Sequence, residues 1–196
     1  TAFGIWFNQG EVCTAGSRLI VEDKIKDEFL AKVMAIGQKM MPGDPLDPKT
    51  QMGAMVDENQ TKRVMGYIDA GQKEGAKLAM GGKQVHIDNA GSFIEPTVFD
   101  NVDNRMKIAQ EEIFGPVLVV LPFDDDDDAV RIANNSIYGL SGGVFGDPER
   151  ARAVARRIRT GTIGINGGNY FAPASPFGGY KQSGLGREMG VAGLEE

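Results

Sequence analysis

The sequence predicts an α/β layered fold, with an open and mostly parallel sheet flanked by helices. Short apolar segments alternate with longer segments of helical periodicity along most of the chain, which is typical of this class. One segment, VLVVLPF at residues 117–123, is apolar almost throughout, as in strands that are buried on both faces. Hydrophobic residues make up 41% and charged residues 24% of the chain, so 196 residues of this composition can form a packed, water-soluble core.

The first half of the chain predicts two long helices. A strand, SRLIVE, ends at Glu22, and residues 23–40 then place apolar side chains at three- and four-residue spacing, which indicates one buried helical face. The segment PGDPLDPKT ends this helix. A second helix is expected from about Asn59 to Glu74, and the glycine-rich AMGGKQVHIDNAGS is expected to form short strands and turns.

The second half continues the alternation. VLVVLPF is expected at the centre of the sheet, followed by a helix over residues 125–136, a strand in LSGGVFG, a helix in DPERARAVARRIRT and a strand in GTIGING. The aspartates of FDDDDDA could bind a hard cation, but calcium loops alternate their ligands and carry a turn glycine. We therefore interpret them as a helix amino terminus, where the helix dipole stabilises acidic side chains.

Charge and composition exclude several classes of partner. The net charge of −6 repels polyanions, so we expect no nucleic acid partner. No apolar run approaches the roughly 18 residues that span a bilayer, and the first ten residues lack a signal-peptide pattern, so we expect no membrane partner and a cytoplasmic location. With one cysteine and one histidine, the chain has too few ligands for a usual zinc site, and no metal is expected.

The single cysteine, Cys13, has two interpretations. A lone cysteine in a domain is more often a small buried residue than a nucleophile. Its neighbours in GEVCTAGSR are small, however, which would admit a carbonyl carbon and leave backbone N–H groups free to hold an oxyanion. The only histidine, His86, lies among polar turn residues and is expected at the surface, so a cysteine–histidine protease is rejected. A carboxylate, or a group outside this chain, would have to act as the base.

Three segments in a fixed order resemble motifs of the aldehyde dehydrogenase superfamily. FNQGEVCTAGSR is similar to the cysteine signature, EEIFGPV to the cofactor-ribose motif, and SPFGGYKQSGLGRE to a loop near the carboxyl terminus of the catalytic domain. The last segment matches neither a phosphate-binding loop nor a dinucleotide fingerprint. The resemblance extends over essentially the whole chain.

The resemblance implies an activity and a set of site residues. Cys13 would attack an aldehyde to form a thiohemiacetal, hydride would pass to NAD or NADP, with NAD favoured, and the resulting thioester would be hydrolysed to a carboxylic acid. Glu112 and Phe114 match positions that contact the nicotinamide ribose and flank the nicotinamide, and Gln60 and Arg63 match further cofactor contacts. Residues 1–196 would form the catalytic domain. The Rossmann-type cofactor domain, the general base and the oligomerisation strand are expected outside this chain.

Substrate and assembly are further expectations from the resemblance. Phe7 and two residues of the loop NGGNYFAPASP, Tyr170 and Phe171, would line the aldehyde tunnel, and their aromatic character favours an apolar or aromatic aldehyde. The full-length protein is expected to be a homodimer or homotetramer, and the chain alone is expected to show little turnover. Two alternatives stay open: an inactive structural or binding homologue, and an enzyme that transfers the acyl group to coenzyme A.

Overall fold

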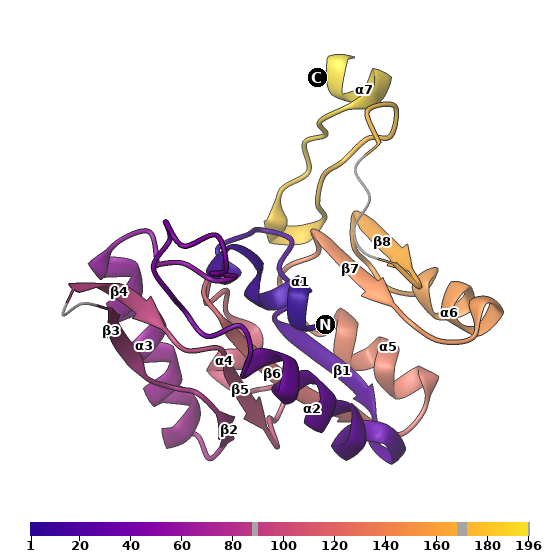
Figure 1. Cartoon of the computed structure of the whole chain (residues 1–196). Helices are drawn as coiled ribbons and strands as arrows, with labels where there is room; N and C mark the ends of the chain where they lie inside the picture. The colour runs from indigo at the N-terminus through magenta and orange to yellow at the C-terminus, as the bar shows by residue number, and fades with distance from the viewer. Residues whose placement is uncertain (88–89, 168–171, 196) are drawn as a thin grey trace. The chain divides into compact units, whose positions relative to one another are not determined.

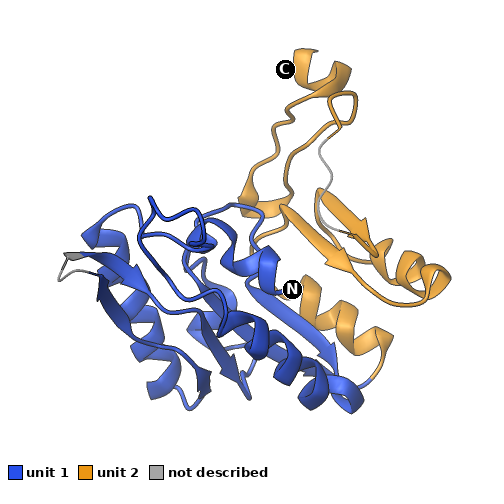
Figure 2. Ribbon diagram, in the orientation of Figure 1, with its two compact units in different colours: residues 1–124 blue, residues 125–196 orange. Residues whose placement is uncertain are grey.

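The computed structural model describes residues 1–87, 90–167 and 172–195 (Figure 1). These residues form two compact units, residues 1–124 and residues 125–196 (Figure 2). Each unit is described by itself below. Two predicted substrate residues, Tyr170 and Phe171, lie outside the described residues.

The first unit contains a four-stranded sheet in the order β1-β6-β5-β2. Its strands are β1 (Arg18–Glu22), β6 (Val117–Phe123), β5 (Thr97–Asp100) and β2 (Lys77–Met80). β6 runs parallel to both β1 and β5, whereas β2 is antiparallel to β5. The prediction of a mostly parallel sheet is therefore confirmed, and so is the central place of VLVVLPF, because residues 117–121 are all buried.

Three α-helices and one 3₁₀-helix of the first unit lie before or after Cys13 in the chain. They are α1 (Ala2–Trp6), the 3₁₀-helix η1 (Phe7–Gly10), α2 (Asp23–Gly37) and α3 (Glu58–Lys73). The helix α2 packs against β1 and β6, and α3 packs against β2 and the strand β4 (Ala90–Ile94), which pairs with β3 (Gln84–Ile87). A short helix, α4 (Lys107–Gln110), lies against α3.

The helix predicted to reach Met40 ends as an α-helix at Gly37. Beyond that point the backbone tightens, because the N–H of Lys39 bonds to the carbonyl of Ile36 and that of Met40 to the carbonyl of Gly37. These are three-residue bonds of the 3₁₀ type, common at the last turn of a helix. Met40 is nevertheless buried, which is why its apolar character extended the predicted periodicity.

Trp6 anchors α1 to the sheet. Its ring is fully buried, and its indole Nε1–H donates to the carbonyl of Pro116, 110 residues away, at 3.3 Å. Leu118 and Val120 of β6, also fully buried, belong to the same apolar cluster. Burying these side chains holds the segment that leads to Cys13 beside the amino end of β6.

In the second unit, the described residues 125–167 and 172–195 form two short parallel strands and four short helices. They are α5 (Asp126–Asn134), β7 (Ser141–Val144), α6 (Pro148–Ala155), β8 (Thr162–Ile165), the 3₁₀-helix η2 (Lys181–Ser183) and α7 (Gly190–Glu195). Over residues 1–87, 90–167 and 172–195, no helix is both long and apolar enough to cross a bilayer.

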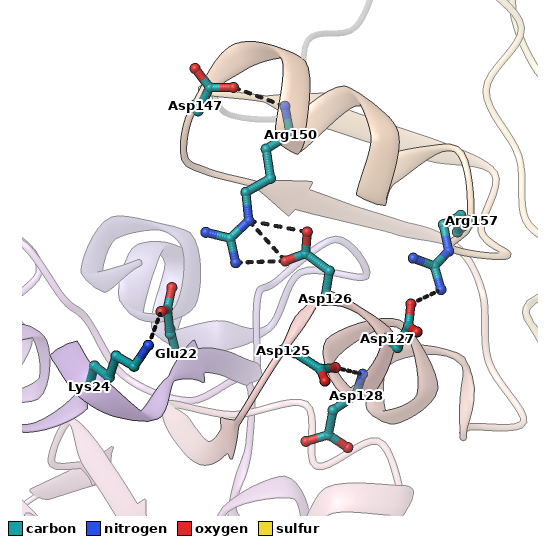
Figure 3. Close-up of polar contacts among 9 residues, drawn as sticks. All are labelled: Glu22, Lys24, Asp125, Asp126, Asp127, Asp128, Asp147, Arg150 and Arg157. Carbon is teal, nitrogen blue, oxygen red and sulfur yellow. Dashed lines mark hydrogen bonds and ion pairs between the residues drawn. The ribbon is translucent and has the colours of Figure 1, made fainter.

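The aspartates of FDDDDDA begin a helix, as predicted. Asp125 is the N-cap of α5 and accepts a hydrogen bond from the N–H of Asp128 at 2.9 Å. Asp126 pairs with Arg150 of α6 and Asp127 pairs with Arg157, each at 2.6 Å (Figure 3). The guanidinium of Arg150 holds the pKa of Asp126 below its ordinary value. These carboxylates therefore cap the amino end of the helix and form ion pairs with arginines.

Candidate active site

Cys13 lies exposed at the centre of a tight turn. The N–H of Ala15 donates to the carbonyl of Val12 at 2.9 Å, which makes Cys13 and Thr14 the two central residues. Central N–H groups take no part in the bond that closes such a turn. Among the described residues, neither of these two N–H groups finds an acceptor. An exposed sulfur beside unused N–H groups contradicts the interpretation of Cys13 as a small buried residue.

Three consecutive residues with left-handed backbone lead into this turn. Asn8, Gln9 and Gly10 have φ values of 49°, 59° and 74°. The first two are held by hydrogen bonds: the N–H of Glu11 donates to the carbonyl of Asn8 at 3.0 Å, and Gln9 Oε1 accepts from the N–H of Gly53 at 3.1 Å. The bend lies within η1, just before the turn of Cys13, and places Gly10 against another part of the chain.

Gly10 packs directly against the turn that carries Glu112 and Phe114. A Cβ at Gly10 would lie 2.2 Å from the carbonyl oxygen of Gly115, far inside van der Waals contact. Only glycine allows this approach, and only glycine adopts a φ of 74° without strain. The structure therefore brings together two motifs that are about a hundred residues apart in the sequence, so this contact closes a long loop of the chain.

A further contact holds the cysteine loop to the segment before α3. The carboxylate of Glu11 accepts the N–H of Val56 with both oxygens, at 3.2 and 3.1 Å. Burial raises the pKa of Glu11, and this is only partly offset by the hydrogen bond from Val56. Glu11 is the carboxylate closest to Cys13 in sequence, and its oxygens are engaged in holding the backbone.

The two glutamates of EEIFGPV have different environments. Glu111 accepts a hydrogen bond from the hydroxyl of Tyr67 at 2.8 Å and lies 3.9 Å from Lys107. Burial and the bond to Glu111 raise the pKa of Tyr67. The exposed carboxylate of Glu112 has no hydrogen-bond or ion-pair partner among the described residues. Glu112 is therefore available to accept hydrogen bonds from a ligand, whereas Glu111 stabilises the protein itself.

Gln60 and Arg63 of α3 contact the backbone of the same turn. Gln60 Nε2 donates to the carbonyl oxygens of Ile113 and Phe114, at 3.1 and 2.7 Å. An Arg63 guanidinium nitrogen, Nη2, donates to the carbonyl of Glu112 at 3.1 Å. Phe114, which is half-buried, has a φ of 58°. The structure thus brings together the four predicted cofactor residues.

The predicted substrate residue Phe7 is exposed and forms an aromatic pair. Its ring lies 4.9 Å from that of Phe3, with an angle of 34° between the planes, and the two side chains are 53% and 69% exposed. The sequence analysis missed Phe3. The signal was present, because Phe3 and Phe7 are four residues apart at the start of the chain, but α1 is too short to show a periodicity.

Two further features singled out in the sequence, His86 and the segment SPFGGYKQSGLGRE, have environments of their own. His86 is exposed on β3, as expected for a surface histidine. In the second unit, the cations of SPFGGYKQSGLGRE donate to backbone carbonyls of the same unit: Lys181 Nζ to those of Asn134 and Ser136 at the end of α5, and Arg187 to that of Gly179. No group of three potential metal ligands is present in the part of the chain that the structure describes.

Comparison with known proteins agrees with this geometry. The family model described as "Aldehyde dehydrogenase family" matches residues 1–196. The human "Aldehyde dehydrogenase, mitochondrial" is 46% identical over 194 residues, which are 98% of this chain and 37% of that protein. A putative aldehyde dehydrogenase of Staphylococcus aureus is 50% identical over 192 residues, 96% of this chain and 40% of the relative.

Solved structures extend the match to three dimensions. The aldehyde dehydrogenase KauB from Pseudomonas aeruginosa has a TM-score of 0.95 and 49% identity, over 99% of this chain and 39% of that one. A variant of the P. syringae indole-3-acetaldehyde dehydrogenase AldA, in complex with NAD+ and IAA, has the same TM-score and coverage at 48% identity. The chain therefore spans about two fifths of these relatives. With a family match over its entire length, an exposed cysteine in the first matching motif and the expected fold, this chain belongs to the aldehyde dehydrogenase family.

Proposed function

We propose that the full-length protein containing this chain oxidises an aldehyde to a carboxylic acid with a nicotinamide cofactor. The observation that carries the proposal is the junction of two motifs: an exposed Cys13 with unused backbone N–H groups, and the turn of Glu112, held against it through Gly10 and Gly115. Membership of the aldehyde dehydrogenase family supports this activity.

In the proposed reaction, Cys13 provides the nucleophile. Its Sγ, as the thiolate, bonds to the aldehyde carbon, and the carbonyl electron pair moves to oxygen to give a thiohemiacetal oxyanion. The backbone N–H of Cys13, which has no acceptor among the described residues, is available to donate a hydrogen bond to this oxyanion. When the carbonyl re-forms, hydride leaves the carbon and a thioester to Cys13 remains. Water then attacks the thioester carbon, and the Cys13 thiolate leaves as the acid forms.

The cofactor residues suit a nicotinamide nucleotide. Glu112 has an exposed carboxylate without a partner among the described residues, and such a group can accept two hydroxyl hydrogen bonds from a ribose diol. When bound, the nicotinamide ring accepts the hydride. NAD is favoured over NADP because several structures of similar proteins are NAD+ complexes. We propose that the base that activates water comes from elsewhere in the polypeptide, because Glu11 is engaged by Val56.

We further propose an apolar or aromatic aldehyde as substrate. The exposed pair of Phe3 and Phe7 offers two aromatic rings, tilted by 34° to each other, near the start of the cysteine loop. One similar structure, at 49% identity, is an indole-3-acetaldehyde dehydrogenase, whose named substrate is aromatic. Another, at 42% identity, is a betaine aldehyde dehydrogenase, so a cationic aldehyde belongs among the compounds to be compared.

The direct test follows reduced cofactor with the full-length protein, benzaldehyde and NAD. We expect Cys13→Ala to abolish turnover while the protein remains folded by circular dichroism. Glu112→Gln should raise the KM for NAD about tenfold, since a neutral amide accepts ribose hydroxyls less well. Lys62→Met, a change on the exposed face of α3, is the control and should leave both constants unchanged.

Product and substrate comparisons separate the alternatives. Carboxylic acid formed without a thiol acceptor supports hydrolysis, whereas an absolute requirement for coenzyme A would indicate acyl transfer. Undiminished turnover in Cys13→Ala contradicts the mechanism, and a complete lack of turnover in the parent protein with all aldehydes favours an inactive homologue. A strong preference for succinic semialdehyde or betaine aldehyde over benzaldehyde refutes the proposed substrate class.

A further inference from the structure

We propose that Gln60 and Arg63 are positioning residues, which act on the bound cofactor through the backbone of residues 112–115. This inference rests on the proposed function and changes the role expected for the two side chains, from direct cofactor contacts to supports of the turn that presents Glu112. We call residues 112–115 the ribose turn.

Gln60 uses its amide nitrogen on the ribose turn. Its two N–H groups reach two consecutive carbonyls, those of Ile113 and Phe114. Phe114 has a φ of 58°, which is strained for a residue with a Cβ and persists only where its surroundings hold it. The paired hydrogen bonds from Gln60 provide this restraint, because they hold the peptide before Phe114 and the peptide after it.

Arg63 holds the residue that we expect to meet the ribose. Its guanidinium donates to the backbone carbonyl of Glu112 at 3.1 Å. The same guanidinium lies over the ring of Tyr67, 5.8 Å from its centroid, and the Tyr67 hydroxyl holds Glu111. An exposed arginine is thereby restricted in position, and the backbone at Glu112 is fixed from the side of α3.

Both donors come from one stripe of a rigid helix. Gln60, Arg63, Val64 and Tyr67 follow the spacing of residues on one helical face. Val64 packs beneath the ribose turn so closely that a Cβ at Gly115 would lie 2.5 Å from its Cγ2. The stripe therefore meets the turn with two polar side chains and one apolar side chain.

The amino end of α3 is fixed as well. Asp57 caps the helix by accepting the N–H of Gln60 at 2.7 Å, and the hydroxyl of Thr61 donates to the Asp57 carbonyl at 2.9 Å. Because hydrogen bonds fix its first turn, α3 can hold the backbone of the ribose turn in one position. Glu112 has no side-chain partner among the described residues, so within the protein it is the held backbone that sets where its side chain starts and which region the carboxylate can reach.

The experiment compares Gln60→Glu with Gln72→Glu in the full-length protein. Glutamate keeps the size of glutamine but replaces the donating NH₂ by an acceptor that repels the two carbonyls. Gln72 lies on the same helix, and within the described part of the chain its amide donates only to the carbonyl of Ile68 in that helix, at 3.5 Å, which makes it a matched control. Amide hydrogen exchange of residues 110–117 is measured in the protein without cofactor, and the Kd of NAD by calorimetry.

We expect Gln60→Glu to accelerate exchange in residues 110–117 about tenfold before any cofactor is added, and to raise the Kd of NAD by a similar factor. Gln72→Glu should change neither. Arg63→Met should weaken NAD binding and Arg63→Lys should restore part of it, since a lysine can still donate to the Glu112 carbonyl.

Two results would overturn the inference. A raised Kd with unchanged exchange in the free protein would show that Gln60 contacts NAD directly, and faster exchange with an unchanged Kd would show that the turn's order does not affect the cofactor. If the parent protein binds NAD but oxidises no aldehyde, the proposed function fails while these two measurements still decide the inference. If the parent does not bind NAD, both fail.

Discussion

Replacing Gly10 by alanine tests whether the loop of Cys13 and the ribose turn are held together by a contact that only glycine permits. The new Cβ would lie 2.2 Å from the carbonyl oxygen of Gly115 and 3.0 Å from that of Ile5. The backbone of Gly10 also has a φ of 74°. The substitution therefore introduces both conformational strain and a clash between two backbones, neither of which can be relieved by a side-chain rotation.

The magnitude follows from these two effects. A left-handed conformation costs an alanine about 1–2 kcal/mol. To restore ordinary contact, the two backbones must separate by about 1 Å, and overpacking of this kind costs about 1–3 kcal/mol. Together they predict a loss of about 2–5 kcal/mol in the free energy of unfolding of the first unit.

Two other glycines provide controls for each effect. Gly75 has a φ of 94° and no atom within 4 Å of its ideal Cβ, so Gly75→Ala measures conformational strain alone, about 1–2 kcal/mol. Gly4 lies in α1, also has no atom within 4 Å of its ideal Cβ, and has an ordinary φ. Gly4→Ala should therefore be neutral or stabilising by about 0.5–1 kcal/mol.

The assay is urea unfolding of the 196-residue chain followed by the emission of Trp6, its only tryptophan, which is buried in the first unit. We expect the order of stability Gly4→Ala, Gly75→Ala, Gly10→Ala from highest to lowest. If Gly10→Ala is no less stable than Gly75→Ala, the backbone contact with Gly115 contributes nothing and the reasoning is refuted.

Three further changes address stability. Lys26→Met should destabilise by about 3 kcal/mol, because it leaves the carboxylate of Asp100 without its cation in a site where both side chains are at least 86% buried. The pair with Asp100 raises the pKa of Lys26, so its contribution should persist below the unfolded pKa and disappear only as strongly alkaline pH passes the raised value. Glu11→Gln should be more stable than the parent at pH 7, and its stability should depend less on pH. Burial raises the pKa of Glu11, so the parent loses stability as the pH rises from the ordinary pKa of a glutamate through the raised pKa. A urea midpoint of Glu11→Gln at pH 7 below that of the parent would contradict this. Asp57→Ala removes the cap of α3 and should cost about 1 kcal/mol in thermal unfolding, whereas Asp57→Asn should cost much less.

Elements with strong periodicity were predicted well. The second helix was expected from about Asn59 to Glu74 and extends from Glu58 to Lys73, because its apolar stripe and its acidic cap are both local signals. The helices α1 and α4 were missed, because segments of five and four residues are too short to show a period. The antiparallel direction of β2 also depends on pairing with β5, which no local pattern records.

The amino-acid sequence by itself determined the fold class, the alternation of helices and strands, and the motifs that identify Cys13 and Glu112. These are properties of neighbouring residues, such as periodicity, capping and turn composition. Only the tertiary structure decided that Cys13 is exposed in a turn with unused N–H groups, that Glu112 is unpaired among the described residues while Glu111 is engaged, and that Gln60 and Arg63 hold backbone carbonyls. Those facts depend on the approach of Gly10 to Gly115 and of α3 to the ribose turn, contacts between distant segments that packing alone brings together.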